Sequence, residues 1–161
     1  MMGAGKTTIG KLLAEKTGRK FIDTDKLIEK RLGRPISQFF KLYGEQAFRD
    51  HETAVIKSLT NGSFVVATGG GVNRRNENED HLLSIGRVIY LRSEPSELIR
   101  RLQARKQKRP LLSSDDWEEK LVSILQSRAE RYEMANVTVD VDDVDQDEIV
   151  ERVLVAIEES K

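Results

Sequence analysis

Residues 2–8 read Met-Gly-Ala-Gly-Lys-Thr-Thr, and this stretch constrains the fold of the chain more than any other. Apolar residues at helical spacing follow it at once, so a helix is expected to begin inside it. Its small residues allow successive backbone N–H groups to converge on anionic oxygens, and the helix start adds its positive end. The stretch therefore predicts a phosphate-binding loop, in which Lys6 contacts terminal phosphates and the Thr7 hydroxyl binds Mg²⁺.

The complete pattern of such a loop is G-x-x-x-x-G-K-[ST], and its first glycine would lie one residue before Met1. The strand that leads into the loop is missing from the sequence as well. We expect this strand to be present in a longer native chain. The chain as printed is then expected to be less stable and less active, because an absent central strand leaves unpaired edges and a gap in the core.

Composition favours one helix-rich domain spanning residues 1–161. Apolar residues make up 38% of the chain and charged residues 34%, which separates it from disordered proteins. Lysine plus arginine equals aspartate plus glutamate at 27 each, so bulk charge gives no reason to expect a nucleic-acid or membrane partner. With no cysteine, no signal peptide and no apolar run long enough for a membrane span, we expect the protein in the cytoplasm. A monomer is expected as well.

Short apolar runs alternate along the chain with segments of helical periodicity, which predicts a parallel, three-layer α/β sheet. Strands are expected at 20–23, 63–68, 87–91 and 137–141, and the second of these is expected to be buried on both faces. Helices are expected from the loop to Gly18, then at 25–32, 45–60, 97–105, 117–135 and 146–159, with a polar helix ending near 83. Ligands on such sheets bind at the carboxyl ends of the strands.

Asp23-Thr24-Asp25 lies at the carboxyl end of a predicted strand, so two interpretations are open. Aspartate and threonine are common helix N-caps, and the stretch can be a simple strand-to-helix turn. Alternatively, Asp23 holds Mg²⁺ through water, while Asp25 orients an acceptor hydroxyl and takes its proton.

Two arginines on predicted helices are candidates for binding an anion. Arg49 has Glu45 four residues before it and Glu52 three residues after it, which can also be a surface ladder of ion pairs. Arg128 lies close to an apolar stripe formed by Leu121, Leu125, Ala129 and Tyr132. A guanidinium on an inward face needs an anionic partner, either a structural carboxylate or a bound acid.

The segment from 98 to 112 contains six basic residues and no acidic one. A solvated helix face is the usual explanation of such a run, and a nucleic-acid patch would need interleaved aromatic residues that are absent. The position of Arg109 beside Pro110 favours a lid, at about 106–116, that closes over phosphates.

Taken in order, six motifs resemble the shikimate kinase family over nearly the whole chain. They are M-G-A-G-K-T-T at 2–8, D-x-D at 23–25, F-R-x-x-E at 48–52, A-T-G-G-G at 67–71, R-P-L-L at 109–112 and R-x-x-x-Y at 128–132. The resemblance implies a fold like that of the nucleoside monophosphate kinases, with strand order 2-3-1-4-5 and strand 1 largely missing here. It also implies MgATP-dependent phosphorylation of the 3-hydroxyl of shikimate.

The same resemblance implies a role for each matching residue. ATP phosphates would be bound by Gly3, Ala4, Gly5, Lys6, Thr7, Thr8 and Arg109, with Lys6, Asp25 and Arg109 as catalytic groups. Mg²⁺ would be bound directly by Thr7 and through water by Asp23. Shikimate would be bound by Asp25, Arg49, Gly70 and Arg128, the two arginines gripping its carboxylate.

Two rival interpretations remain open at this point. A gluconate-type or nucleotide kinase would use the same scaffold with a different acceptor pocket. A protein that binds a nucleotide but no longer transfers phosphate would also keep the loop, although it has no reason to keep Asp25, Arg49 and Arg128 together.

Overall fold

The computed structural model describes residues 1–104 and 116–159. Two compact units are formed: an N-terminal unit of Lys6–Val88, and a C-terminal unit of Met1–Gly5 with the described residues from Ile89 onward. The organisation of 1–161 as a single domain stays a prediction. Most of the predicted lid lies outside the described residues.

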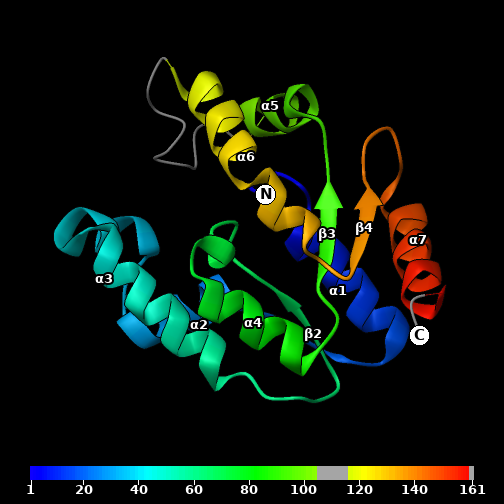
Figure 1. The fold of residues 1–161 in the computed structure, drawn as a ribbon, viewed down its shortest axis with the longest axis horizontal. Helices are drawn as coiled ribbons and strands as arrows, with labels where there is room; N and C mark the ends of the chain where they lie inside the picture. Colours follow the sequence, from blue (N-terminus) through cyan, green and yellow to red (C-terminus); the bar gives the residue numbers. More distant parts are fainter. Residues whose placement is uncertain (105–115, 160–161) are drawn as a thin grey trace. The chain divides into compact units, whose positions relative to one another are not determined.

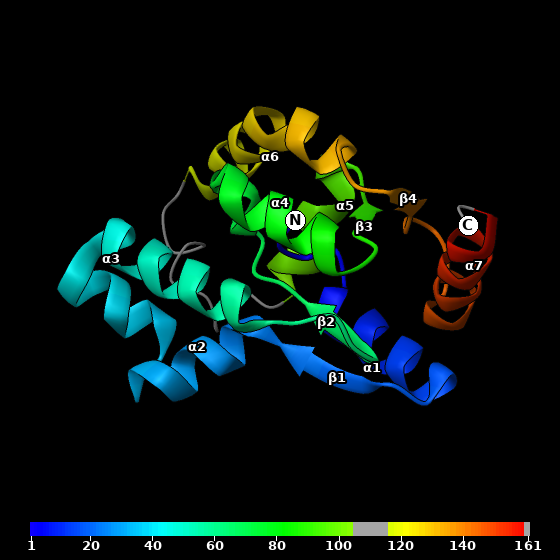
Figure 2. The ribbon, with the colours of Figure 1, turned by 60° about the horizontal axis from the view of Figure 1, so that its bottom comes forward.

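The N-terminal unit contains two parallel strands with helices on both faces. Its elements are α1 (Lys6–Thr17), β1 (Lys20–Asp23), α2 (Thr24–Leu32), α3 (Ile36–Ser58), β2 (Phe64–Ala67), the 3₁₀ turn η1 (Val72–Arg74) and α4 (Asn76–Ile85). In Figure 2, β1 and β2 run side by side and α1 lies along them. The polar helix expected after the three glycines is thus preceded by a short 3₁₀ turn.

Register decides which side chains of this small sheet face which helix. Phe21 pairs with Val65, and a Cβ on Gly10 of α1 would lie 2.8 Å from the Phe21 ring and 3.7 Å from Val65 Cγ1. The glycine therefore lets α1 pack closely on one face. On the other face, Ile22 and Val66 pack against the apolar cluster of Ile56, Leu59 and Val72.

The expected burial of 63–68 on both faces is wrong at its start, because Phe64 is 37% exposed. Burial increases toward the carboxyl end of β2, where Ala67 is covered. A side chain at the amino end of a four-residue strand lies at the rim of the sheet, beyond the cover of the helices.

Two glycines set the course of the chain through α2 and α3. Gly33 adopts φ 65° and ends α2, as the sequence predicts. Gly44, at φ 79° and ψ 177°, breaks α3 internally, so Glu45 opens a second helical segment where a helix start is expected. Ile28, Phe39, Phe48 and Val55 bury together where α2 meets α3.

The C-terminal unit repeats the pattern with a second parallel strand pair (Figure 1). Its elements are β3 (Ile89–Arg92), α5 (Pro95–Gln103), α6 (Trp117–Glu133), β4 (Val137–Asp140) and α7 (Gln146–Glu159). β3 begins two residues later than the strand expected at 87–91. α5 and α6 pack together, with Leu98, Leu102, Trp117 and Leu121 each at most 3% exposed.

The observed strand pairs are β1 with β2 and β3 with β4, each parallel. Counting the expected leading strand as strand 1, these are pairs 2-3 and 4-5 of the predicted order 2-3-1-4-5. In the described part of the chain, no strand precedes Lys6. Nor does any helix there combine the length and apolar character that crossing a membrane requires.

Gly33→Ala is expected to lower the free energy of unfolding by about 1 kcal/mol. The added Cβ would meet nothing within 4 Å, so the cost comes only from the left-handed backbone at φ 65°. Gly86→Ala is the matched control, because its Cβ also meets open space while its backbone is extended at φ −179°. Urea denaturation followed by circular dichroism measures both. Equal midpoints for the two variants would contradict the prediction.

Candidate active site

The glycine-rich stretch forms a tight turn directly before α1. Gly3 and Gly5 adopt φ 88° and 86°, a left-handed conformation that side-chain-bearing residues rarely take. A Cβ on Gly3 would also lie 3.2 Å from Leu102 Cγ. The first turn of α1 contains no acidic residue. Its positive end is therefore not offset by a carboxylate of its own, which suits the binding of anionic phosphates.

Thr7 and Asp23 meet where α1 and β1 bring them together. The Thr7 hydroxyl donates to Asp23 Oδ2 at 3.1 Å, although the residues are 16 apart in the sequence. The other carboxylate oxygen, Oδ1, accepts from the backbone N–H groups of Asp25 (3.1 Å) and Lys26 (3.3 Å). Asp23 thus caps α2 and also presents a carboxylate oxygen beside the Thr7 hydroxyl, while the binding of Mg²⁺ through water by Asp23 and the role of Asp25 toward an acceptor stay predictions.

Thr24, between the two aspartates, ties β1 to the three glycines after β2. Its side chain is 1% exposed, and its Oγ1 accepts from Gly69 N at 3.2 Å. A Cβ on Gly69 would lie 2.7 Å from Asp25 Oδ1 and 3.2 Å from Glu52 Oε1. Two carboxylates therefore crowd around Gly69, and only a residue without a side chain leaves them room.

The environment of Asp25 disfavours its charged form. Burial is the main cause that raises the pKa of its carboxyl above the ordinary value of 3.8, and the negative charge of Asp23 acts in the same direction. The positive charge of Lys6 opposes both effects, and Glu52 adds to them. A carboxylate with a raised pKa beside a cation is suited to accept a proton.

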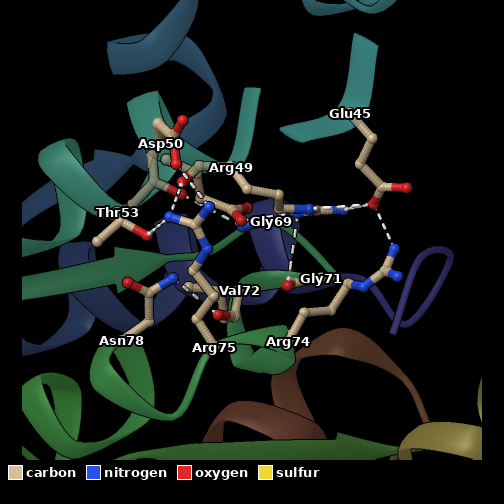
Figure 3. A network of polar contacts seen from close by, with 12 residues as sticks. Glu45, Arg49, Asp50, Thr53, Gly69, Gly71, Val72, Arg74, Arg75 and Asn78 are labelled. Carbon is tan, nitrogen blue, oxygen red and sulfur yellow. Dashed lines mark hydrogen bonds and ion pairs between the residues drawn. The ribbon is translucent and has the colours of Figure 1, made fainter. Parts of the chain in front are cut away.

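Arg49 is held by carboxylates on both sides, as Figure 3 shows for Glu45. Its Nη1 donates to Glu52 Oε2 at 2.7 Å, and its Nη2 donates to Glu45 Oε1 at 2.9 Å. The ladder expected from the sequence exists and runs inward from the surface: the Glu45 side chain is 45% exposed, that of Arg49 13% and that of Glu52 only 2%. A Cβ on Gly71 would lie 2.8 Å from Arg49 Nη2, so this glycine gives the guanidinium its space.

Arg75 forms a second link between α3 and the segment after the three glycines (Figure 3). Its Nη1 donates to the Arg49 carbonyl (3.3 Å) and to Thr53 Oγ1 (3.2 Å). Its Nη2 donates to Asp50 Oδ1 at 2.6 Å. The sequence analysis missed this residue, since an arginine at the start of a polar helix gives no local sign of a contact 22–26 residues away.

Arg128 lies half-buried on α6, on the covered side of the helix. The stripe proposed for this helix is wrong at Ala129, which is exposed, whereas Leu121 is buried and Leu125, Arg128 and Tyr132 are half-buried. Tyr132, one turn after Arg128, stacks on Tyr90 of β3 at 5.0 Å between ring centroids. Burial raises the pKa of the Tyr132 hydroxyl, and a hydrogen bond with Arg128 opposes this. The R-x-x-x-Y motif thus joins a guanidinium to an anchored ring.

The remaining predicted site residues differ in what the structure says of them. Gly70 lies half-buried between the two glycines described above, and its contact with an acceptor stays a prediction. Ala4 is buried and Thr8 exposed in the first loop. Arg109, together with the lid up to 115, lies outside the described residues.

A phosphate-binding loop opening a helix, within pairs of parallel strands, is the arrangement of the P-loop kinases. The solved structure of the shikimate kinase from Acinetobacter baumannii in complex with shikimate matches with a TM-score of 0.92 at 37% identity. The match covers 99% of this chain and 90% of that chain. The shikimate kinase from Bacteroides thetaiotaomicron matches with a TM-score of 0.89 at 32% identity, over 98% and 94% of the two chains.

Sequence comparison agrees with the fold. The family model described as shikimate kinase matches residues 2–158. The shikimate kinase of Thermodesulfovibrio yellowstonii is 40% identical over 154 residues, which is 95% of this chain and 88% of the relative. That of Enterococcus faecalis is 36% identical over 159 residues, or 98% and 95% of the two chains. The chain belongs to the shikimate kinase family.

Gly69→Ala is expected to lower kcat/KM by about 100-fold, because the new Cβ displaces the Asp25 carboxylate from its position. The free energy of unfolding is expected to fall by only about 1–3 kcal/mol, the usual cost of overpacking. Steady-state kinetics and thermal unfolding of the same preparation separate the two effects. Gly86→Ala is the control, since its Cβ meets no atom within 4 Å. Activity near wild type in Gly69→Ala would contradict the role given to Gly69.

Proposed function

We propose that this chain transfers the γ-phosphate of ATP to the 3-hydroxyl of shikimate, giving shikimate 3-phosphate and ADP. The observation that carries the proposal is that a carboxylate and a guanidinium lie close to the three glycines at 69–71. There, the half-buried Asp25 carboxylate and the Arg49 guanidinium each lie against a glycine that has no room for a Cβ. The Asp25 carboxylate can accept a proton from a hydroxyl, and the Arg49 guanidinium can bind a carboxylate through two N–H groups. A small hydroxylated acid as acceptor requires both.

The phosphate side is assigned to the loop and to the start of α1. Backbone N–H groups of Gly3–Thr8 and the Lys6 ammonium bind the ATP phosphates in this proposal. The Thr7 hydroxyl and the Asp23 carboxylate fit a Mg²⁺ ion bound directly by Thr7 and through water by Asp23, because their hard oxygen atoms lie 3.1 Å apart. Bound there, Mg²⁺ offsets the charge of the phosphate oxygens.

On the acceptor side, Asp25 accepts the proton of the 3-hydroxyl of shikimate. The oxygen of that hydroxyl bonds to the γ-phosphorus of ATP, and the bond between the γ-phosphorus and the leaving ADP breaks. Arg49 and Arg128 bind the shikimate carboxylate, and Gly70 contacts the ring through its backbone. Arg109 is assigned to the ATP phosphates on the basis of the R-P-L-L motif. We further propose that the protein acts as a cytoplasmic monomer without a nucleic-acid or membrane partner.

Shikimate is expected to stimulate ADP release from MgATP, whereas gluconate and nucleoside monophosphates are not. A coupled assay of ADP formation with each acceptor, with and without Mg²⁺, measures this.

Lys6→Ala is expected to abolish transfer, while Arg128→Ala is expected mainly to weaken shikimate binding in calorimetry. Turnover with gluconate or a nucleoside monophosphate, and none with shikimate, would overturn the proposal.

Asp23→Asn is expected to shift the acid limb of the kcat/KM profile to lower pH. The negative charge of Asp23 is one cause of the raised pKa of Asp25, so its removal lets Asp25 ionise at lower pH. Asparagine still caps α2, which limits damage to the fold. Asp80→Asn is the control, because it removes an equal charge from an exposed position on α4. An unmoved acid limb in Asp23→Asn would argue against Asp25 as the titrating group.

A further inference from the structure

One carboxylate oxygen, Glu45 Oε1, receives hydrogen bonds from two arginines (Figure 3). Arg49 donates to it through Nε at 3.2 Å and Nη2 at 2.9 Å, and Arg74 donates to it through Nη1. Glu45 and Arg74 are both half-exposed, with side-chain exposures of 45% and 47%. Glu45 therefore has a second cationic partner at the surface besides Arg49.

The N–H groups of Arg49 have two carboxylate partners, the buried Glu52 and the exposed Glu45. Nη1 donates to the buried Glu52 at 2.7 Å and approaches the Gly71 carbonyl at 3.4 Å. The opposite edge, made of Nε and Nη2, is a fork whose geometry matches a carboxylate. That edge is the one Glu45 occupies. A ligand carboxylate that binds Arg49 through this fork must first displace Glu45.

We propose that Glu45 is a specificity-determining residue, which occupies the carboxylate-binding edge of Arg49 and moves to Arg74 when the carboxylate of the acceptor binds. The inference rests on the proposed function, in which Arg49 binds that carboxylate. A charged carboxylate replaces the charge that Glu45 withdraws from Arg49. A neutral ligand cannot replace the negative charge of Glu45 beside Arg49, so it leaves the Glu45–Arg49 ion pair intact. Glu45 thereby favours carboxylate ligands over neutral analogues of the same shape.

The contrast between the two glutamates supports this division of roles. Glu52 is 2% exposed, so its removal from Arg49 would leave a buried, unpaired charge. Glu45 is exposed enough for water and Arg74 to replace what it loses. Burial opposes ionisation of Glu45, but hydrogen bonds from Arg49 and the charges of both arginines outweigh it and lower the pKa of its carboxyl. Glu45 is thus a charged competitor at neutral pH.

Glu45→Gln is expected to tighten shikimate binding by about two- to fivefold, the usual worth of an exposed ion pair. Affinity for the methyl ester of shikimate is expected to stay unchanged, because the ester carries no charge to exchange for that of Glu45. Glu77→Gln is the matched control: it removes the same charge from a side chain 47% exposed and paired with Lys57 rather than Arg49. Isothermal calorimetry of all three proteins with both ligands measures these affinities.

Arg74→Gln is expected to weaken shikimate binding by about two- to fivefold, since Glu45 then has only Arg49 as a partner. On the Glu45→Gln background the same change is expected to have no effect, which a double-mutant cycle detects. Unchanged or weaker shikimate binding in Glu45→Gln, an equal gain for the ester, or additive effects in the cycle would each overturn the inference. Absence of shikimate binding by the wild-type protein would instead overturn the proposed function, and this inference with it.

Discussion

The ion pair between Arg49 and Glu52 is the interaction on which the arrangement of the candidate site depends. Its atoms are 2.7 Å apart, the Glu52 side chain is 2% exposed and the Arg49 side chain 13%, so water has little access to replace either partner. Loss of one partner from such a pair typically costs about 3–5 kcal/mol. Because Gly69 and Gly71 lie against the Glu52 carboxylate and the Arg49 guanidinium, the pair also fixes the course of the chain between them. The site is therefore built around a charge pair and not around an apolar core.

In the proposed function, the phosphate donor and the acceptor are recognised by different means. In that proposal, the ATP phosphates are bound by backbone N–H groups at a turn whose conformation depends on Gly3 and Gly5, and such groups respond to charge without distinguishing one nucleotide from another. The acceptor is assigned to Asp25, whose pKa is raised mainly by burial, and to Arg49, whose charged form is opposed by burial but favoured more strongly by Glu52 and Glu45. The same loop can thus serve many kinases, so the acceptor specificity proposed above rests on the side chains after β1, on α3 and near the three glycines.

Local signals in the sequence predicted most of the elements. The strand at 20–23 and the helix at 146–159 have the expected bounds, because turn residues and caps mark their ends. The pairing of Thr7 with Asp23 follows from motif positions. The roles of Gly69, Arg75 and Glu45 could not be predicted, since each depends on neighbours brought close only by the fold. Ala129 was misplaced because its position fits the helical spacing of the apolar stripe, although apolar residues are not confined to the interior.

Gathering Asp25 and Glu52 around a single glycine has a consequence for how this protein can evolve. Two carboxylates in a half-dry site repel each other, and Gly69 contributes no packing of its own. Each of these choices opposes stability, so substitutions that relieve the repulsion would make the N-terminal unit more robust while removing its chemistry. Selection for stability alone would therefore be expected to replace residues around Gly69 before others. The approach of Asp25 and Glu52 to Gly69 is thus a place where the arrangement proposed for activity opposes stability.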